Sequence, residues 1–255
     1  MTKQPSNYGI TEQHIEQFRN DGYFLLQSAL SPEQLALLRA EAQFSIDRMD
    51  AQMDALQTDM IGISHRNRRY FAANVFRQRP ALESFLFGDL MAELCRATLG
   101  QQAHLFWEQY VIKCAEGDMR FSWHQDSGYI GHKVKPFMTC WIALDDVDEE
   151  NGTVYLLPQS VSGIRTWVKH EREPATNDMV GYFGREPGVP VVGPAGTIAC
   201  FASTTFHRSG PNLSGKMRRV YLAQYSEEVI CKNDGTPWEN DIAFLDGGRI
   251  VAQGR

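Results

Sequence analysis

The sequence has no closely spaced cysteine pair and no long hydrophobic run. No stretch of about 18 apolar residues occurs, and the opening residues, MTKQPSNYGITEQ, lack the apolar segment of a signal peptide. The five cysteines are an odd number with no C-x-x-C spacing, which argues against a zinc knuckle and a disulfide framework. We therefore expect neither a signal peptide nor a membrane span. The expected location is cytoplasmic, with reduced thiols at Cys95, Cys114, Cys140, Cys200 and Cys231.

Several catalytic signatures are also missing. The chain contains no G-x-S-x-G element, no glycine- and lysine-containing phosphate loop and no dinucleotide fingerprint, so hydrolase, NTPase and nicotinamide-dependent functions have no support. A net charge of -6 does not favour binding to nucleic acid. The expected partner is a small molecule, and the oligomeric state does not follow from the sequence.

The first hundred residues are predicted to be mainly helical. The clearest helix start is SPEQLALLRAEAQ, with Ser31 as the N-cap, Pro32 at the first helical position and Gln34 as the capping-box partner. Apolar residues then recur at helical spacing, so this helix is predicted to run to about Leu56. The preceding GYFLL segment is predicted to be a strand.

After Gly100 the pattern changes to short runs rich in β-branched and aromatic residues, separated by Gly, Pro and Asp. No helical pattern of the βαβ type lies between them. The predicted fold is mainly β with a helical N-terminal part. Its core would be an antiparallel barrel or a double-stranded β-helix (jelly roll), flanked by α-helices. The predicted strands are HLFWEQYVIKC, FMTCWIALDDV, TVYLLP, GTIACF and RRVYLAQYS.

We expect one domain over residues 1–255. Its parts would be a helical support region (1–100), a jelly-roll core (101–230) and a C-terminal segment (231–255). A long stretch rich in charge, Gly and Pro, residues 159–194, is predicted to be a structureless lid over a site. Its aromatic residues would either line the substrate or anchor the loop on the barrel; they are Trp167, Tyr182 and Phe183.

The segment FSWHQD contains an H-x-D triplet. If it is extended, His124 and Asp126 point to the same face of the strand and can converge on one metal ion. A second histidine, His207, follows the strand-like GTIACF. Two imidazoles and one carboxylate are the donor set of non-haem Fe(II) oxygenases. We therefore predict an iron site formed by these three residues.

An arginine adds a second feature to this pattern. Arg218 lies eleven residues after His207, at the start of a predicted strand. A 2-oxo acid that chelates iron needs a partner for its distal carboxylate, and a guanidinium group suits that geometry better than lysine. Strand alternation allows only one of Arg218 and Arg219 to face the site.

Taken together, these motifs resemble the phytanoyl-CoA dioxygenase (PhyH-like) family of Fe(II)/2-oxoglutarate-dependent oxygenases. The resemblance rests on FRNDGYFLLQSALSPEQLALLRAE, WHQD, CWIALDDVDEENGTVYLLPQS and FHRSGPNLSGKMRRVYLAQY. It implies iron ligation by His124, Asp126 and His207, and Arg218 as the partner of the 2-oxoglutarate carboxylate. It also implies pocket roles for Ser209, Gln125 and Trp141.

By the same resemblance, the enzyme would use O2 and 2-oxoglutarate to hydroxylate an unactivated C-H bond, releasing succinate and CO2. Halogenating relatives replace the carboxylate ligand by a small residue, so the intact Asp126 favours hydroxylation. One departure is visible: where the family often reads P-G-S-H, this chain has Pro158 to Val161 as PQSV. This difference would affect the structure of the loop or its contacts with substrate, and not the iron chemistry.

Two alternatives stay open at this point. A jelly roll that keeps its metal but does not turn over would be a sensor or carrier protein. A basic cluster formed by Arg66, Arg68 and Arg69 would either recognise an anionic group of the substrate or form an exposed, internally paired charge run.

Overall fold

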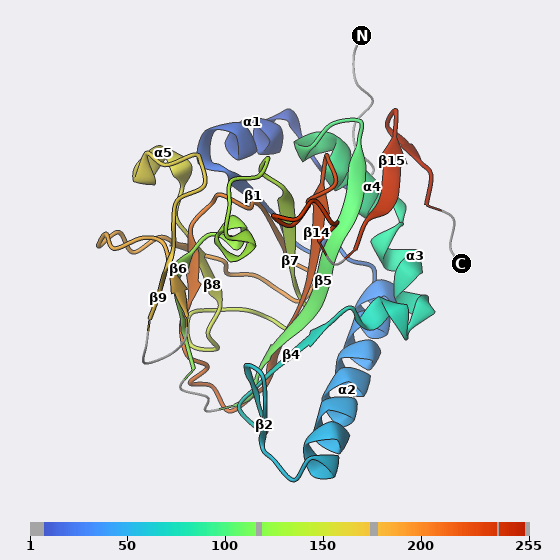
Figure 1. The fold of residues 1–255 in the computed structure, drawn as a ribbon, viewed down its shortest axis with the longest axis vertical. Helices are drawn as coiled ribbons and strands as arrows, with labels where there is room; N and C mark the ends of the chain where they lie inside the picture. The colour runs from blue at the N-terminus through green and yellow to red at the C-terminus, as the bar shows by residue number, and fades with distance from the viewer. Residues whose placement is uncertain (1–7, 116–118, 174–177, 239, 253–255) are drawn as a thin grey trace.

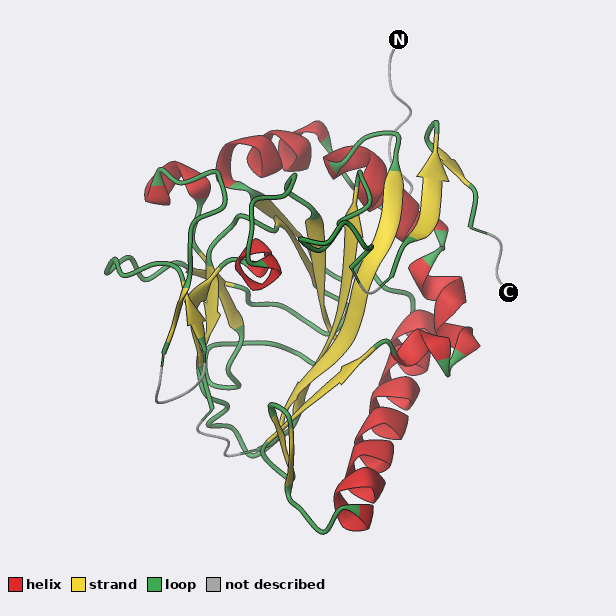
Figure 2. Ribbon diagram, viewed as in Figure 1, coloured by secondary structure: helices red, strands yellow, loops and turns green. Residues whose placement is uncertain are grey.

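The structure is a computed structural model that describes residues 8–115, 119–173, 178–238 and 240–252. Its strands form two antiparallel sheets and a separate two-stranded ribbon. The helices between residues 32 and 98 lie on the outer side of the larger sheet (Figures 1 and 2). The fold thus confirms the predicted mainly β architecture with a helical N-terminal part. Within the described residues, no helix combines the length and apolar character needed to cross a membrane.

Most of the helical structure precedes residue 100. The 3-10 helices η1 (Val75–Arg77) and η2 (Pro80–Leu82) connect the larger elements, and η3 (Asp126–Ile130) follows the first strand of the smaller sheet. The α-helices are α1 (Glu12–Asp21), α2 (Pro32–Ala55), α3 (Glu83–Leu86), α4 (Asp89–Thr98) and α5 (Gln159–Ser162).

Helix α2 begins where the sequence predicts. The backbone N–H of Gln34 donates to the Ser31 hydroxyl, and the Gln34 side chain accepts from the Ser31 N–H, which completes the capping box. The described helix ends at Ala55, one residue before the predicted end. Its buried residues, including Leu38 and Ile46, pack in the main hydrophobic core.

The larger sheet has the strand order β1-β12-β7-β14-β5-β4-β3-β2, with β15 added beside β5 and β16 paired to β15. Its central strands are covered on both faces, which explains why their sequences are almost continuously apolar rather than alternating. Its strands are β1 (Tyr23–Leu26), β2 (Met60–Ile61), β3 (Ser64–His65), β4 (Arg69–Ala73), β5 (Ala103–Lys113), β7 (Met138–Ala143), β12 (Ile198–Ala202), β14 (Arg218–Ser226), β15 (Ile242–Asp246) and β16 (Arg249–Ile250).

The smaller sheet has the order β11-β8-β13-β6. It lies on the side of the larger sheet away from α2, α3 and α4, as Figure 1 shows. The two sheets therefore enclose an interior between them. The strands of the smaller sheet are β6 (Phe121–His124), β8 (Val154–Leu156), β11 (Val189–Pro190) and β13 (His207–Ser209).

The described part of the predicted lid is not structureless, and its role as a lid stays a prediction. Residues 159–194 include helix α5, the ribbon of β9 (Glu171–Arg172) with β10 (Met179–Val180), and β11, which pairs with β8. Tyr182 packs against Phe206 with a ring-centroid distance of 5.1 Å, so it anchors the segment. The segment is thus built into the barrel wall; its residues 174–177 lie outside the described part of the chain.

Candidate active site

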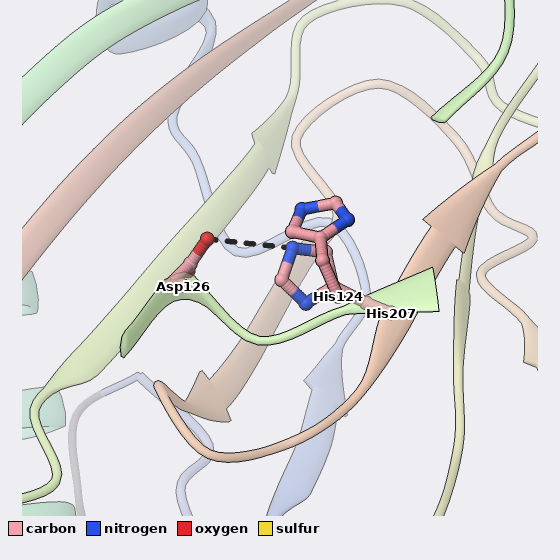
Figure 3. A group of neighbouring side chains, drawn as sticks. All are labelled: His124, Asp126 and His207. Carbon is pink, nitrogen blue, oxygen red and sulfur yellow. Dashed lines mark ion pairs between the residues drawn. The ribbon is translucent and has the colours of Figure 1, made fainter. Parts of the chain in front are cut away.

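Three side chains converge inside the smaller sheet. His124 ends β6, Asp126 begins η3, and His207 begins β13, where it is the direct cross-strand partner of His124. Gln125 is extended (φ -108°, ψ 142°), which directs the residues on either side of it to the same face, as predicted. The possible ligand atoms of the three residues all lie within 4.8 Å of one another (Figure 3).

Hydrogen bonds to the backbone fix the two imidazole rings. Nδ1 of His124 lies 2.7 Å from the carbonyl of Ser122, and Nδ1 of His207 lies 3.1 Å from that of Thr205. A carbonyl only accepts, so each Nδ1 must carry the proton. Each Nε2 is then left with a free lone pair, which is the form that binds a metal.

The carboxylate is oriented in a similar way. Oδ2 of Asp126 accepts from the Thr139 hydroxyl at 2.5 Å and from Nε2 of Gln224 at 3.0 Å. Its other oxygen, Oδ1, lies 3.4 Å from Nε2 of His207. One carboxylate oxygen is therefore held by the protein and the other faces the histidines.

The electrostatic environment keeps two of these groups deprotonated at neutral pH. Burial, together with the neighbouring His207, lowers the pKa of His124 to about 3. Burial alone would raise the pKa of Asp126, but the two histidines and the hydrogen bond from Thr139 outweigh it, and the pKa is lowered. Neutral imidazole and ionised carboxylate are the protonation states that metal binding requires.

A cavity of about 400 Å³ opens beside this cluster, a size typical of small-molecule sites. Arg218 lines the cavity and is 1% exposed. Its Nη2 donates to the carbonyl of Gly152 at 3.0 Å, whereas Nε and Nη1 have no hydrogen-bond partner among the described residues. Burial lowers the pKa of this guanidinium to about 10, but it remains charged at neutral pH. A buried cation with unused donors suits an anionic ligand.

A second cation, Lys113, lies directly across the sheet from Arg218. Its ammonium donates to the Ser209 hydroxyl at 2.8 Å and to the carbonyl of Gly210. Burial lowers its pKa well below the usual value, and the nearby Arg218 and Arg69 lower it further. Sequence reasoning missed Lys113. The signal was a lysine that ends the apolar run YVI of a predicted strand, but its position beside Arg218 depends on the register between two distant segments.

The remaining predicted pocket residues divide into two groups. Ser209 and Trp141 line the cavity. Gln125 does not: its amide donates to the carbonyls of Thr166 and Thr204, and its side-chain oxygen accepts from the Val168 N–H. The expectation that Gln125 lines the cosubstrate pocket is therefore wrong, because a residue between two ligands on an extended segment must face the other way. It fastens the loop after α5 instead.

Arg219 and the basic cluster have other partners. Arg219 forms a two-pronged ion pair with Asp145, with Nη2 at 2.6 Å from Oδ1 and Nε at 3.0 Å from Oδ2, away from the cavity. Arg66 bonds to Asp54 at 2.7 Å and to Asp59 at 2.8 Å. Arg69 is buried and its Nε donates to the carbonyl of Ile63. Of the two alternatives for the basic cluster, Arg66 therefore fits the internally paired charge run.

The fold and the three-residue cluster define a jelly-roll protein with the donor set of a non-haem iron oxygenase. The family model for phytanoyl-CoA dioxygenase (PhyH) matches residues 18–220, and the chain belongs to this family. It is accordingly an iron- and 2-oxoglutarate-dependent oxygenase, with Fe(II) as cofactor and 2-oxoglutarate and O2 as cosubstrates.

Comparisons with individual proteins agree with this assignment. A probable alpha-ketoglutarate-dependent hypophosphite dioxygenase from Stutzerimonas stutzeri is 30% identical over 155 residues, which are 57% of this chain and 53% of that protein. The solved carbocyclase SnoK of nogalamycin biosynthesis has a TM-score of 0.72 at 18% identity, covering 94% of this chain and 98% of SnoK. EctD from S. alaskensis, solved with 2-oxoglutarate and 5-hydroxyectoine, has a TM-score of 0.70 at 18% identity, covering 99% of this chain and 88% of EctD. These structures support the fold.

Proposed function

We propose that this oxygenase hydroxylates a small molecule at an unactivated C-H bond and releases succinate and CO2. The observation that carries the proposal is the presence, in one cavity, of the His124, Asp126 and His207 cluster and the buried guanidinium of Arg218 with two nitrogens free. The first feature suits iron and the second suits the distal carboxylate of 2-oxoglutarate.

The residues would divide the work as follows. His124, Asp126 and His207 hold the metal, through the two Nε2 atoms and the Asp126 oxygen that faces them. Iron bound there would supply the oxidant for the C-H bond, and O2 and 2-oxoglutarate would be consumed as 2-oxoglutarate is oxidatively decarboxylated. Arg218 fixes the cosubstrate's orientation through its carboxylate, and Lys113 lies beside Arg218 and donates to the hydroxyl of Ser209.

Hydroxylation is proposed over halogenation because the carboxylate ligand is present and firmly held. Thr139 and Gln224 both donate to Asp126, and they are cross-strand partners in the larger sheet. The Asp126 oxygen that faces the histidines would occupy the metal position that a halide needs, and the hydrogen bonds to its other oxygen hold the carboxylate in place.

Turnover without the primary substrate tests whether the protein is a catalyst. Iron-loaded protein is incubated aerobically with 2-oxoglutarate, and succinate and oxygen uptake are measured. We expect slow, iron-dependent succinate formation in the wild type and none in His207→Ala. The matched control is His104→Ala, because His104 pairs with Asp241 outside the cavity, and its succinate yield should equal that of the wild type. Folded, iron-loaded wild type that forms no succinate would favour the sensor or carrier alternative.

A further inference from the structure

The cavity continues beyond the cosubstrate end into a region with a different lining. We propose that this region, the substrate half, binds an uncharged molecule with aromatic or fused rings and one polar group that hydrogen-bonds to Gln109. The inference rests on the proposed function and specifies its substrate class. The substrate half is defined by Phe106, Trp107, Gln109, Ile130, Phe137, Leu222 and Trp238, all of which line the cavity.

The register between β5 and β14 orders the cavity from one end to the other. Lys113 lies opposite Arg218 at the cationic end, Gln109 lies opposite Leu222, and Trp107 lies opposite Gln224, which contacts the proposed metal ligand Asp126. Six residues separate Arg218 from Gln224, about 20 Å along an extended antiparallel strand. Along this strand pair, Arg218 and Lys113 therefore lie at one end, and Trp107 lies at the other, near the metal cluster.

Aromatic side chains form most of the wall at this end. Phe106 and Phe137 pack with a ring-centroid distance of 5.0 Å, and Trp107 and Trp238 pack against the same cluster. Phe106 and Trp107 come from β5, and Phe137 and Trp238 come from other segments, so distant parts of the chain build this wall together. Aromatic walls favour a flat ring system, because its ring can stack on the faces of the wall side chains or pack against their edges.

The charged residues that line the cavity are already occupied elsewhere. Apart from the proposed metal ligands and Arg218, the described residues that line the cavity include one charged side chain, Arg208. Its guanidinium lies over the ring of Tyr155 at 3.9 Å and donates to the carbonyl of Pro187. An anionic or cationic substrate would therefore be desolvated in the substrate half without a counter-ion, which is strongly unfavourable.

One neutral polar group remains available. The side-chain amide of Gln109 lines the cavity and makes no hydrogen bond to any part of the chain that the structure describes. An amide has both donors and an acceptor, so it can pair with a hydroxyl or a carbonyl group. Gln109 would select the orientation of an otherwise apolar ring system relative to the metal.

Two fluorescent probes that differ only in charge test this proposal. N-phenyl-1-naphthylamine is neutral, and 8-anilinonaphthalene-1-sulfonate has the same rings with an added sulfonate. Both are titrated anaerobically into protein loaded with Fe(II) and 2-oxoglutarate, after its visible charge-transfer band has been recorded. We expect saturable one-site binding of the neutral probe, about tenfold tighter or more than that of the sulfonate.

Three variants locate the binding site. Trp107→Ala should weaken binding of the neutral probe about tenfold by removing a wall of the site. Phe183→Ala is the matched control, because Phe183 is an aromatic residue exposed on the surface and should leave the affinity unchanged. Gln109→Arg places a cation in the substrate half and should reverse the preference in favour of the sulfonate. Partly unfolded protein also binds this sulfonate, so the gain supports the proposal only if binding is saturable at one site and the charge-transfer band of the variant is intact.

The outcomes separate this inference from the proposed function. If the charge-transfer band forms but the sulfonate binds as tightly as the neutral probe to the wild type, the substrate class is wrong and the oxygenase assignment stands. Loss of probe binding in Phe183→Ala but not in Trp107→Ala would likewise overturn the proposal. If no band forms, the proposed function fails, whatever the probes do.

Discussion

Replacing Arg218 by Met should change the stability of the ligand-free protein and the affinity for 2-oxoglutarate in opposite directions. Burial lowers the pKa of this guanidinium from 12.5 to about 10, which corresponds to roughly 3 kcal/mol that disfavours the charged form in the folded protein. The substitution removes this cost. It also removes the hydrogen bond to Gly152, worth about 1 kcal/mol. The ligand-free variant should therefore gain up to about 2 kcal/mol, or roughly 5 °C in Tm.

The affinity for 2-oxoglutarate should fall sharply in the same variant. Removing one partner of a buried, hydrogen-bonded charge pair costs about 2–5 kcal/mol, which is a factor of roughly 30 to several thousand in Kd. Thermal unfolding with and without 2-oxoglutarate, under anaerobic conditions with Fe(II), measures both effects. Wild-type protein at 100 times its Kd should gain about 2.7 kcal/mol from the ligand. The variant should gain less than about 1 kcal/mol at that concentration.

Arg219→Met is the matched control. Arg219 is the next residue on the same strand, but it pairs with Asp145 on the opposite face. This variant should lose a little stability and keep the full stabilisation by 2-oxoglutarate. The reasoning would be refuted if Arg218→Met were strongly destabilised without ligand yet retained its response to 2-oxoglutarate, since Arg218 would then be a structural residue.

Three further predictions concern other buried groups. Burial raises the pKa of Glu108 to about 7, above its value of 4.5 when unfolded. The free energy of unfolding of the wild type should therefore fall by about 3 kcal/mol between pH 4.5 and 8, and Glu108→Gln should lack this fall. Urea unfolding at pH 5 and pH 8 checks this, and equal pH dependence in both proteins would contradict it. Lys113→Met should raise the Kd for 2-oxoglutarate about tenfold in an anaerobic absorption titration, because it removes the buried amino group that holds Ser209 beside Arg218. An unchanged Kd would exclude that role. With Asp126 intact, turnover in chloride buffer should give no chlorinated product by mass spectrometry, and any such product would refute the hydroxylase assignment.

Local patterns in the sequence predicted much of the fold and the convergence of the cluster. The capping box at Ser31 and the apolar runs after Gly100 depend on neighbouring residues, so they could be interpreted without tertiary information. The same holds for His124 and Asp126, whose shared face follows from the alternation of an extended strand. Iron binding by these residues stays a prediction, although the structure brings them together as expected.

Features that depend on strand register could not be predicted in this way. Lys113 is distant in sequence from Arg218 and Ser209, and only the pairing of β5 with β14 brings it beside them. The strands β9, β10 and β11 are two residues long, too short to show a period, so their segment looked structureless. For Gln125, the local pattern predicted the placement better than the family resemblance did. Strand alternation directs its side chain away from the cavity, whereas the resemblance implied a role in the pocket.

The measurement that tests the central claim most directly is anaerobic visible absorption of metal-free protein after addition of Fe(II) and 2-oxoglutarate. The account predicts a metal-to-ligand charge-transfer band in the wild type. The band should be lost in His207→Ala and should require far more 2-oxoglutarate in Arg218→Ala. Well-folded, iron-loaded wild type that shows no band, or a His207→Ala variant that keeps it, would contradict the assignment of this cavity as the iron and 2-oxoglutarate site.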